Sequence, residues 1–181
     1  DFEIELTENV TRSSTVLMLD LSLSMPMRDN FLSAKKVAMA LHSLISSRFP
    51  RDYLGIVGFS EVARVLKPEQ LPEVSWDFVY GTNMQHAFVL SRQLLARQSG
   101  TKQIIMITDG QPTTFTSWSD DESWGGAWGR RSGRVAQETL REVVRCTKDG
   151  ITLNLFMMER ERQLSEFVAL SQLKDAVNRT I

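Results

Sequence analysis

Continuous hydrophobic runs alternate along this chain with segments in which apolar side chains recur at helical spacing. The continuous runs predict strands buried on both faces of a sheet, and they cover residues 15–19, 53–59, 103–108 and 151–158. The periodic segments predict helices from residue 31 to a stop at Pro50, and over about 83–98, 134–148 and 164–173. Strands alternating with helices in this way are typical of an α/β domain with a mostly parallel central sheet.

Apolar stripes on the predicted helices indicate which side chains face the sheet. In the first helix the stripe consists of Phe31, Ala34, Val37, Ala38, Leu41, Leu44 and Ile45. In the helix over 134–148 the inward side chains are expected to be Val135, Leu140, Val143 and Val144. Residues 63–66 form a short further strand, which we expect to pair with 53–59 as a hairpin across Ser60 and Glu61.

One long segment, residues 111–133, has no periodicity and yet contains Trp118, Trp124 and Trp128. A loop of this length inside a compact domain is usually functional or disordered. Because it follows the strand that ends at residue 108, we expect it to leave the sheet at that strand's carboxyl end. The interpretations stay open: the rings form a contact surface for a partner, or they pack on the domain itself, or the segment is disordered.

Length and composition predict a single globular domain over residues 1–181. The first residue is Asp1 rather than Met, so we expect the domain to be part of a longer protein. The 21 Lys and Arg residues balance 22 Asp and Glu residues, which gives no electrostatic support for nucleic-acid binding. No hydrophobic run is long enough to span a membrane. The single cysteine, Cys146, excludes an internal disulfide and favours a cytoplasmic location.

Oxygen-bearing side chains cluster at the predicted ends of two buried strands. Asp20 ends the first strand, Asp109 follows the strand over 103–108, and Ser22 and Ser24 come two and four residues after Asp20. In open α/β sheets, ligands bind beyond the carboxyl ends of the strands. Thr82, at the start of a predicted helix, can present its hydroxyl at the same edge. Two carboxylates and three hydroxyls suit a hard divalent cation such as Mg²⁺ or Ca²⁺.

These residues resemble the metal-ion-dependent adhesion site (MIDAS) of von Willebrand factor A (VWA) domains. The resemblance is carried by Asp20-Leu21-Ser22-Leu23-Ser24, by Thr82 and by Thr108-Asp109-Gly110, and it extends to the order of the predicted elements. It implies a three-layer, doubly wound α/β fold with helices on both faces of the sheet. The chain is most similar to bacterial members that are not adhesion receptors. Because only residues 174–181 follow the last predicted helix, the family's final strand should be at most a stub and its final helix absent, which leaves a switch through that helix in doubt.

The resemblance also implies a role for each site residue. Ser22, Ser24 and Thr82 would bind the metal through their hydroxyls, and Asp20 and Asp109 would hold it through water molecules. Mg²⁺ is the expected cation, with Mn²⁺ or Ca²⁺ as alternatives. An Asp or Glu of a partner protein would complete the metal's coordination, so the expected function is cation-dependent protein–protein interaction without catalysis. A system containing an AAA+ ATPase is the partner that the resemblance implies.

Each part of the motif also has an ordinary explanation. Asp109-Gly110 is a common turn dipeptide, Thr82 fits a helix capping box, and the two serines fit turn positions. A metal-dependent phosphatase or phosphotransferase with Asp20 as nucleophile is the alternative function, although Ser22 stands where such enzymes place a second acid. A metal-free scaffold domain is a further alternative. His86 and Cys146 are expected to serve as packing residues.

Overall fold

A five-stranded sheet with the order β3-β2-β1-β4-β5 forms the centre of the fold. The structure, a computed structural model, describes residues 12–116 and 132–158. All neighbouring strands are parallel except β2 and β3, which form the predicted hairpin. The strands are β1 (Ser13–Asp20), β2 (Tyr53–Phe59), β3 (Ala63–Leu66), β4 (Thr101–Thr108) and β5 (Ile151–Met157).

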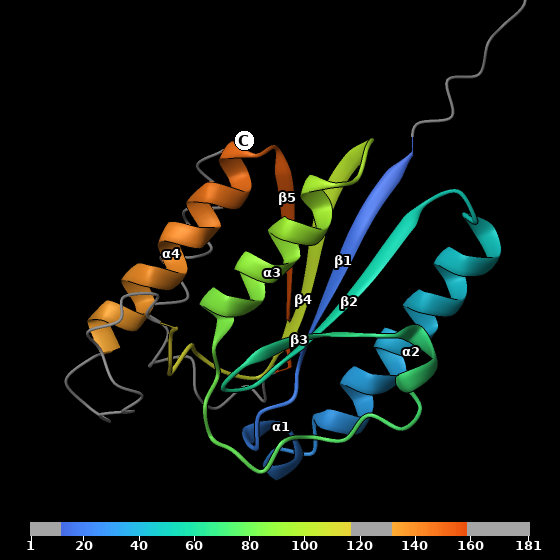
Figure 1. The fold of residues 1–181 in the computed structure, drawn as a ribbon. Helices are drawn as coiled ribbons and strands as arrows, with labels where there is room; N and C mark the ends of the chain where they lie inside the picture. Colours follow the sequence, from blue (N-terminus) through green and yellow to red (C-terminus); the bar gives the residue numbers. More distant parts are fainter. Residues whose placement is uncertain (1–11, 117–131, 159–181) are drawn as a thin grey trace, which may run out of the picture.

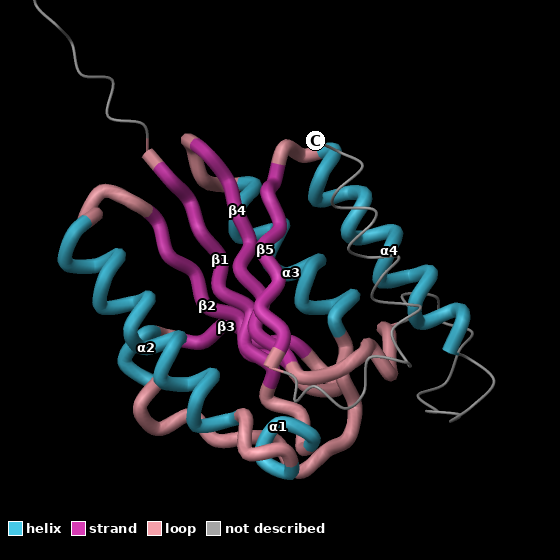
Figure 2. The backbone as a smooth tube through the Cα atoms, turned by 180° about the vertical axis from the view of Figure 1, so that it is seen from behind, coloured by secondary structure: helices cyan, strands magenta, loops and turns pink. Residues whose placement is uncertain are grey.

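Helices cover both faces of this sheet, which confirms the predicted three-layer α/β fold. They are α1 (Ser24–Met27), α2 (Phe31–Arg48), α3 (Met84–Ala96) and α4 (Ser132–Lys148), with a 3₁₀ turn, η1 (Pro68–Gln70). Figure 1 shows α3 and α4 on one face, and the reverse view in Figure 2 shows α2 on the other. Neither the short α1 nor η1 was predicted from the sequence.

Alternate residues of β1 enter two separate cores. Val16 and Met18 pack with α3 and α4, whereas Leu17 and Leu19 pack with α2. All four side chains are fully buried. This two-sided burial explains why the strand has a continuous apolar run instead of an alternating pattern.

The register of the three central strands aligns their carboxyl ends. Asp20 lies opposite Phe59 of β2, and Leu19 lies opposite Ile107 of β4. Asp20 is therefore level with Thr108, the last residue of β4. The turn into α1, at the lower edge of the sheet in Figure 1, starts directly after Asp20.

The predicted apolar stripe of α2 is only partly correct. Phe31, Ala34 and Ala38 are buried, but Val37 is 42% exposed and Leu44 is 51% exposed. At 3.6 residues per turn, these two side chains lie roughly 60–120° around the helix from the buried alanines. The small alanines let the first half of α2 lie close to the sheet. A stripe narrower than the predicted one is then sufficient to cover this face of the sheet.

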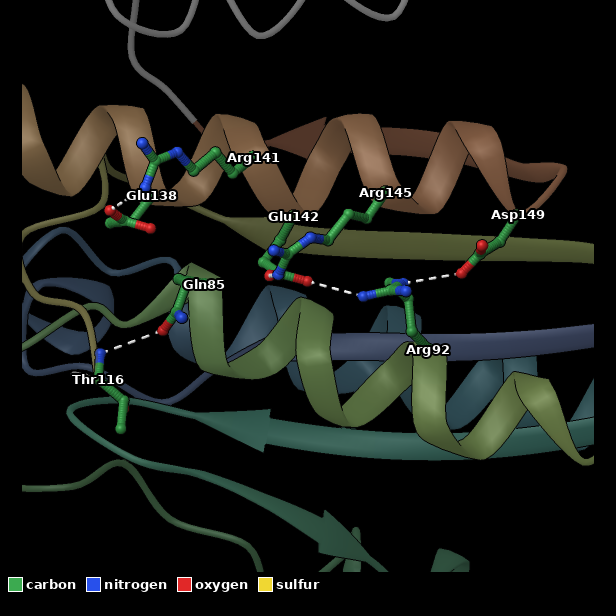
Figure 3. Close-up of polar contacts among 8 residues, drawn as sticks. All are labelled: Gln85, Arg92, Thr116, Glu138, Arg141, Glu142, Arg145 and Asp149. Carbon is green, nitrogen blue, oxygen red and sulfur yellow. Dashed lines mark hydrogen bonds and ion pairs between the residues drawn. The ribbon is translucent and has the colours of Figure 1, made fainter. Parts of the chain in front are cut away.

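In α4 the inward face is more polar than predicted. Val144 is 42% exposed, while Glu142 is buried. Figure 3 shows why the charge of Glu142 is tolerated: its carboxylate accepts a hydrogen bond from Arg145 and another, of 2.9 Å, from Arg92 of α3. Arg92 also reaches Asp149 at 2.9 Å, so one guanidinium links α3 to α4.

Several sequence predictions fall outside the described ranges. They concern the helix over 164–173, the final strand and helix, and the three tryptophans of the 111–133 segment. Within the described ranges, none of the helices has the length and hydropathy needed to cross a membrane.

Gly100 provides a test of the close packing between the α3–β4 turn and the start of β1. Its φ is 84°, and a Cβ atom there would lie 2.0 Å from the carbonyl oxygen of Arg12. Gly150 also has a positive φ, of 72°, but has no atom within 4 Å of the corresponding position. We expect Gly150→Ala to lower the free energy of unfolding by about 1 kcal/mol, through backbone strain alone. Gly100→Ala should lower it by at least about 3 kcal/mol, because the clash adds to the same strain.

Urea denaturation monitored by circular dichroism measures both losses. Equal losses for the two variants would contradict the packing described at Gly100.

Candidate metal site

The side chain of Asp20 is fully buried at the end of β1, and both of its oxygens accept hydrogen bonds. The backbone N–H of Ser22 donates to Oδ1 at 2.9 Å. The hydroxyl of Thr108 donates to Oδ2 at 2.5 Å. Asp20 thus joins the end of β4 to the turn that carries the two serines, and it orients that turn.

A chain of hydroxyl groups leads from this turn to the second carboxylate. The hydroxyl oxygens of Ser22 and Ser24 are 3.0 Å apart. The Ser24 hydroxyl donates to Oδ1 of Asp109 at 2.8 Å. Ser24 is the first residue of α1, and the residue at the helix cap, Leu23, has no side chain that could bond to the helix. The serine hydroxyls are therefore directed to the acidic residues and do not cap a helix.

Asp109 has one carboxylate oxygen that is buried and has no hydrogen-bond partner among the described residues. This atom is Oδ2. Its nearest cation is Arg28, whose Nε lies 3.9 Å away and whose Nη1 donates to the Asp109 carbonyl oxygen at 2.7 Å. A buried acceptor without a partner is costly, and native proteins usually satisfy it with protein, water or an ion. An orphan carboxylate oxygen beside serine hydroxyls fits the ligand set of a hard divalent cation.

Thr82 lies at the same edge of the sheet but is less closely connected to the site. Its backbone N–H donates to the Thr113 hydroxyl at 2.9 Å, and its carbonyl accepts from the Thr113 N–H at 3.0 Å. Thr113 follows Asp109 by four residues, so these bonds tie Thr82 to the segment after β4. In the described part of the chain, its hydroxyl forms no hydrogen bond with Asp20, Ser22, Ser24 or Asp109.

The capping box proposed for Thr82 is not present. The N-cap of α3 is Asn83, whose side chain accepts a hydrogen bond from the backbone N–H of His86 at 3.0 Å. Thr82 precedes the cap and is buried. Helix capping therefore does not account for a threonine at this position.

Two residues of the site were not assigned a role from the sequence. Thr108, the hydrogen-bond donor to Asp20, ends a buried strand directly before an acid, which is a detectable signal. Arg28 gave no such signal, because it lies beyond α1, where Asp29 adopts a left-handed φ of 58° and redirects the chain. Its approach to Asp109, 81 residues later, depends on the tertiary fold.

Burial makes negative charge unfavourable at both acids. It raises the pKa of Asp20 to about 6, a rise that the Ser22 and Thr108 hydrogen bonds oppose and the nearby Asp109 charge reinforces. Burial likewise raises the pKa of Asp109, against the effects of the Ser24 hydrogen bond, the Arg28 charge and the nearby Asn30 side chain. A cation bound beside the two carboxylates would favour their ionised forms.

The remaining candidate groups lie away from these residues. His86 accepts a hydrogen bond from the Ala63 backbone N–H through Nδ1 at 3.2 Å, and Cys146 is buried. Burial raises the pKa of the Cys146 thiol to about 12, which makes it unreactive. Nowhere in the described ranges do three His, Cys, Asp or Glu side chains gather as a ready metal cage. A cation at the sheet edge would therefore depend on hydroxyl oxygens.

Comparison with known proteins identifies the class of this domain. The family described as "Rv0959-like protein, vWA domain" matches residues 13–178. The chain is therefore a VWA domain, and it belongs to the Rv0959-like family. It is 36% identical over 170 residues to the uncharacterized proteins Rv0959 of Mycobacterium tuberculosis and Mb0984 of Mycobacterium bovis. The match covers 93% of this chain but only 25% of each relative.

Solved structures with low sequence identity share the fold. The pilus adhesin SpaC of Lactobacillus rhamnosus GG, in an open conformation, matches with a TM-score of 0.66 and 17% identity, over 94% of this chain and 27% of that one. An aerotolerance-related membrane protein of Bacteroides fragilis gives a TM-score of 0.60 and 18% identity, over 92% and 88%. Proximal thread matrix protein 1 of the mussel byssus, with a zinc-occupied MIDAS motif, gives 0.60 and 14%, over 93% and 46%.

The raised pKa of Asp20 predicts a pH dependence of stability in buffer that contains a chelator. The folded protein holds the Asp20 proton more tightly than the unfolded chain does, because the pKa rises from 3.8 to about 6 on folding. Stability is therefore lost as the pH rises through this interval, and Asp109 acts in the same direction. Between pH 4 and pH 8 the Asp20 contribution amounts to about 2 kcal/mol.

The measurement is urea denaturation of wild type and Asp20→Asn across this pH range. The unfolding free energy of the wild type should fall relative to that of the variant as the pH rises. A difference that stays constant with pH would contradict the raised pKa of Asp20.

Proposed function

We propose that this VWA domain binds a divalent cation at Asp20, Ser22, Ser24, Thr82 and Asp109 and, through it, a carboxylate of a partner protein. One observation carries the proposal above the others. The network that starts at Asp20 and runs through the two serine hydroxyls ends on Oδ1 of Asp109, and the other oxygen of that carboxylate, Oδ2, is buried and has no hydrogen-bond partner among the described residues. These oxygens converge at the carboxyl edge of the sheet, where a protein partner could reach them.

The contacts of each residue indicate its role in binding the cation. Asp20 has both oxygens engaged, so its part is to orient the serine turn and to supply negative charge. Ser22 and Ser24 offer neutral oxygen ligands, Asp109 offers Oδ2, and Thr82 offers a hydroxyl at the same edge. A bound Mg²⁺ would supply positive charge at the site and an exchangeable coordination position for an anion. The hydroxyl ligands are neutral, so they leave more of that charge available to a partner's carboxylate than further carboxylate ligands would.

The comparisons support a divalent cation without specifying which one. The solved mussel protein carries zinc in a MIDAS motif, and it shares only the fold with this chain. We propose Mg²⁺, with Mn²⁺ and Ca²⁺ as alternatives, because hydroxyl and carboxylate oxygens suit hard cations. The proposals of a partner system with an AAA+ ATPase and of a cytoplasmic location rest on the family resemblance and on the single cysteine. The chain spans about a quarter of the length of its curated relatives, so these proposals concern the domain alone.

We expect Mg²⁺ to bind the wild-type domain and to raise its melting temperature. At a concentration 100 times the Kd, binding stabilises the folded state by about 2.7 kcal/mol, or roughly 5–10 °C for a domain of this size. Ser22→Ala and Asp109→Ala should weaken cation binding at least about tenfold by removing a ligand oxygen. Isothermal titration calorimetry and thermal unfolding with Mg²⁺, Mn²⁺ and Ca²⁺ measure these effects.

Ser14→Ala is the matched control for the serine variant. Ser14 lies at the other end of β1, and its buried hydroxyl donates to the Ser99 carbonyl at 2.7 Å. This variant should lose stability but keep the wild-type cation affinity. If no cation produces heat or a shift in melting temperature with the wild type, the metal-free scaffold function replaces the proposal.

A phosphatase or phosphotransferase function makes a different prediction. Phosphatases with an aspartate nucleophile use a second acid two residues later, and this chain has Ser22 there, with its backbone bonded to Asp20. We therefore expect no hydrolysis of p-nitrophenyl phosphate above background with Mg²⁺ present. Turnover that Asp20→Asn abolishes would establish the enzyme and overturn the binding function.

A further inference from the structure

We propose that Arg28 and the exposed apolar side chains of Met27, Phe78 and Tyr80 select the partner segment. The segment that fits has an acidic side chain next to an apolar or aromatic residue. The inference rests on the proposed function: one carboxylate oxygen of the partner would bind at the cation, and the other would accept from Arg28.

The guanidinium of Arg28 lies at the rim of the site and has donors to spare. Nη1 is bonded to the Asp109 carbonyl oxygen, which anchors the group beside the carboxylate. The side chain is nevertheless 45% exposed. Among the described residues, Nη2 and Nε form no hydrogen bond; Nε only approaches Asp109 Oδ2, at 3.9 Å. A planar guanidinium with available N–H groups is well suited to a carboxylate.

The charge of Arg28 has opposite effects on the two binding steps. The site contains the carboxylates of Asp20 and Asp109, so with Arg28 its net charge is −1 when both are ionised. A divalent cation would bring the total to +1, which favours an incoming anion. The same guanidinium repels the cation. Arg28 should therefore weaken cation binding while strengthening carboxylate binding, whereas a residue with a purely structural role would support both.

Two backbone hydrogen bonds hold the segment that carries Phe78 next to the site. The backbone N–H of Asp77 donates to the Leu21 carbonyl at 2.7 Å, and that of Leu23 donates to the Val79 carbonyl at 3.1 Å. These bonds place residues 77–79 directly beside the stretch that contains Ser22. Asp77 itself accepts two hydrogen bonds from Arg64, at 2.8 and 3.0 Å, and one from Ser60 at 2.5 Å.

The apolar side chains near the site are unusually exposed for their size. Phe78 is 82% exposed, Met27 is 68% exposed and Tyr80 is 56% exposed. Met27 directly precedes Arg28, and Phe78 lies between the two backbone hydrogen bonds. The Phe78 ring also lies edge-on to Trp76, with centroids 6.1 Å apart. Large exposed apolar groups on segments beside a polar site are typical of protein-binding surfaces. Next to a cationic site, the complementary ligand combines a carboxylate with a neighbouring apolar side chain.

The probes are three blocked tetrapeptides: Gly-Glu-Phe-Gly, Gly-Glu-Ser-Gly and Gly-Gln-Phe-Gly. Each is titrated into ¹⁵N-labelled domain saturated with Mg²⁺, and chemical shifts give the Kd. The Glu-Phe peptide should bind most tightly, and the Gln peptide should bind at least about tenfold more weakly, because it lacks the charge. Chelation or Asp20→Asn should abolish binding of all three.

Arg28→Gln is the decisive variant. We expect it to weaken the Glu-Phe peptide about five- to tenfold, and to tighten Mg²⁺ binding by about twofold or more in calorimetry at low salt. Arg28→Lys, which keeps the charge, should retain the wild-type Mg²⁺ affinity and part of the peptide affinity. Arg48→Gln, which removes the same charge at the far end of α2, should change neither. Phe78→Ser should remove the preference for Glu-Phe over Glu-Ser.

The other possible results of these experiments have distinct meanings. If Arg28→Gln weakens both steps, or leaves the peptide affinity unchanged, the inference is wrong while the proposed function stands. If Mg²⁺ binds but no Glu peptide does, the inference is wrong and the carboxylate-binding part of the proposed function falls with it, while the cation site stands. If sedimentation shows a dimer that Phe78→Ser dissociates, a second copy covers the apolar surface and the inference is also wrong. Absence of Mg²⁺ binding to the wild type overturns the proposed function and this inference with it.

Discussion

The rest of this site depends on the cost of burying two carboxylates at one edge of a sheet. Asp20 and Asp109 are both removed from water, and burial raises the pKa of each. Hydrogen bonds from polar neighbours offset that cost: Thr108 and the Ser22 backbone donate to Asp20, and Ser24 donates to Asp109. These donors leave one acceptor without a partner, Oδ2 of Asp109, among the described residues. The proposed cation would offset the remaining cost of burying this oxygen.

The sheet makes such an arrangement precise because it aligns the elements that carry the charges. Parallel pairing of β1 with both β2 and β4 brings Asp20 level with Thr108. Beyond Asp20 the chain stays attached: the Leu21 N–H donates to the Phe59 carbonyl at 2.7 Å, and the Leu21 carbonyl accepts from Asp77. The serine turn is thus held from both sides by backbone hydrogen bonds, and side chains with short reach can meet there without a long loop having to order.

Features that depend on neighbouring residues along the chain could be predicted from the sequence, whereas features that depend on contacts made in the folded protein could not. The continuous apolar run of β1 predicted its burial, because a strand covered on both faces needs apolar residues at every position. The sequence predicted too wide an apolar stripe on α2. The distance between a helix and a sheet depends on how small residues such as Ala34 and Ala38 pack in the folded protein. Val144 was placed inward where the structure buries Glu142, because the compensating Arg92 lies on another helix. The role of Arg28 was not predicted for the same reason: its partner Asp109 is close only in the folded protein, and no sequence spacing indicates their contact.

The serine hydroxyls have a consequence that follows from counting protons. A hydroxyl has one hydrogen, and that of Ser24 is donated to Asp109. The hydrogen of Ser22 is therefore directed either to the Ser24 oxygen, 3.0 Å away, or to Asp20, whose carboxylate the Ser22 side chain also contacts. Both lone pairs of the Ser22 oxygen are then left for an electrophile, and no serine proton has to be displaced to receive one. In either case the hydroxyl oxygen of Ser22 is available to a cation in the arrangement that the protein has without one.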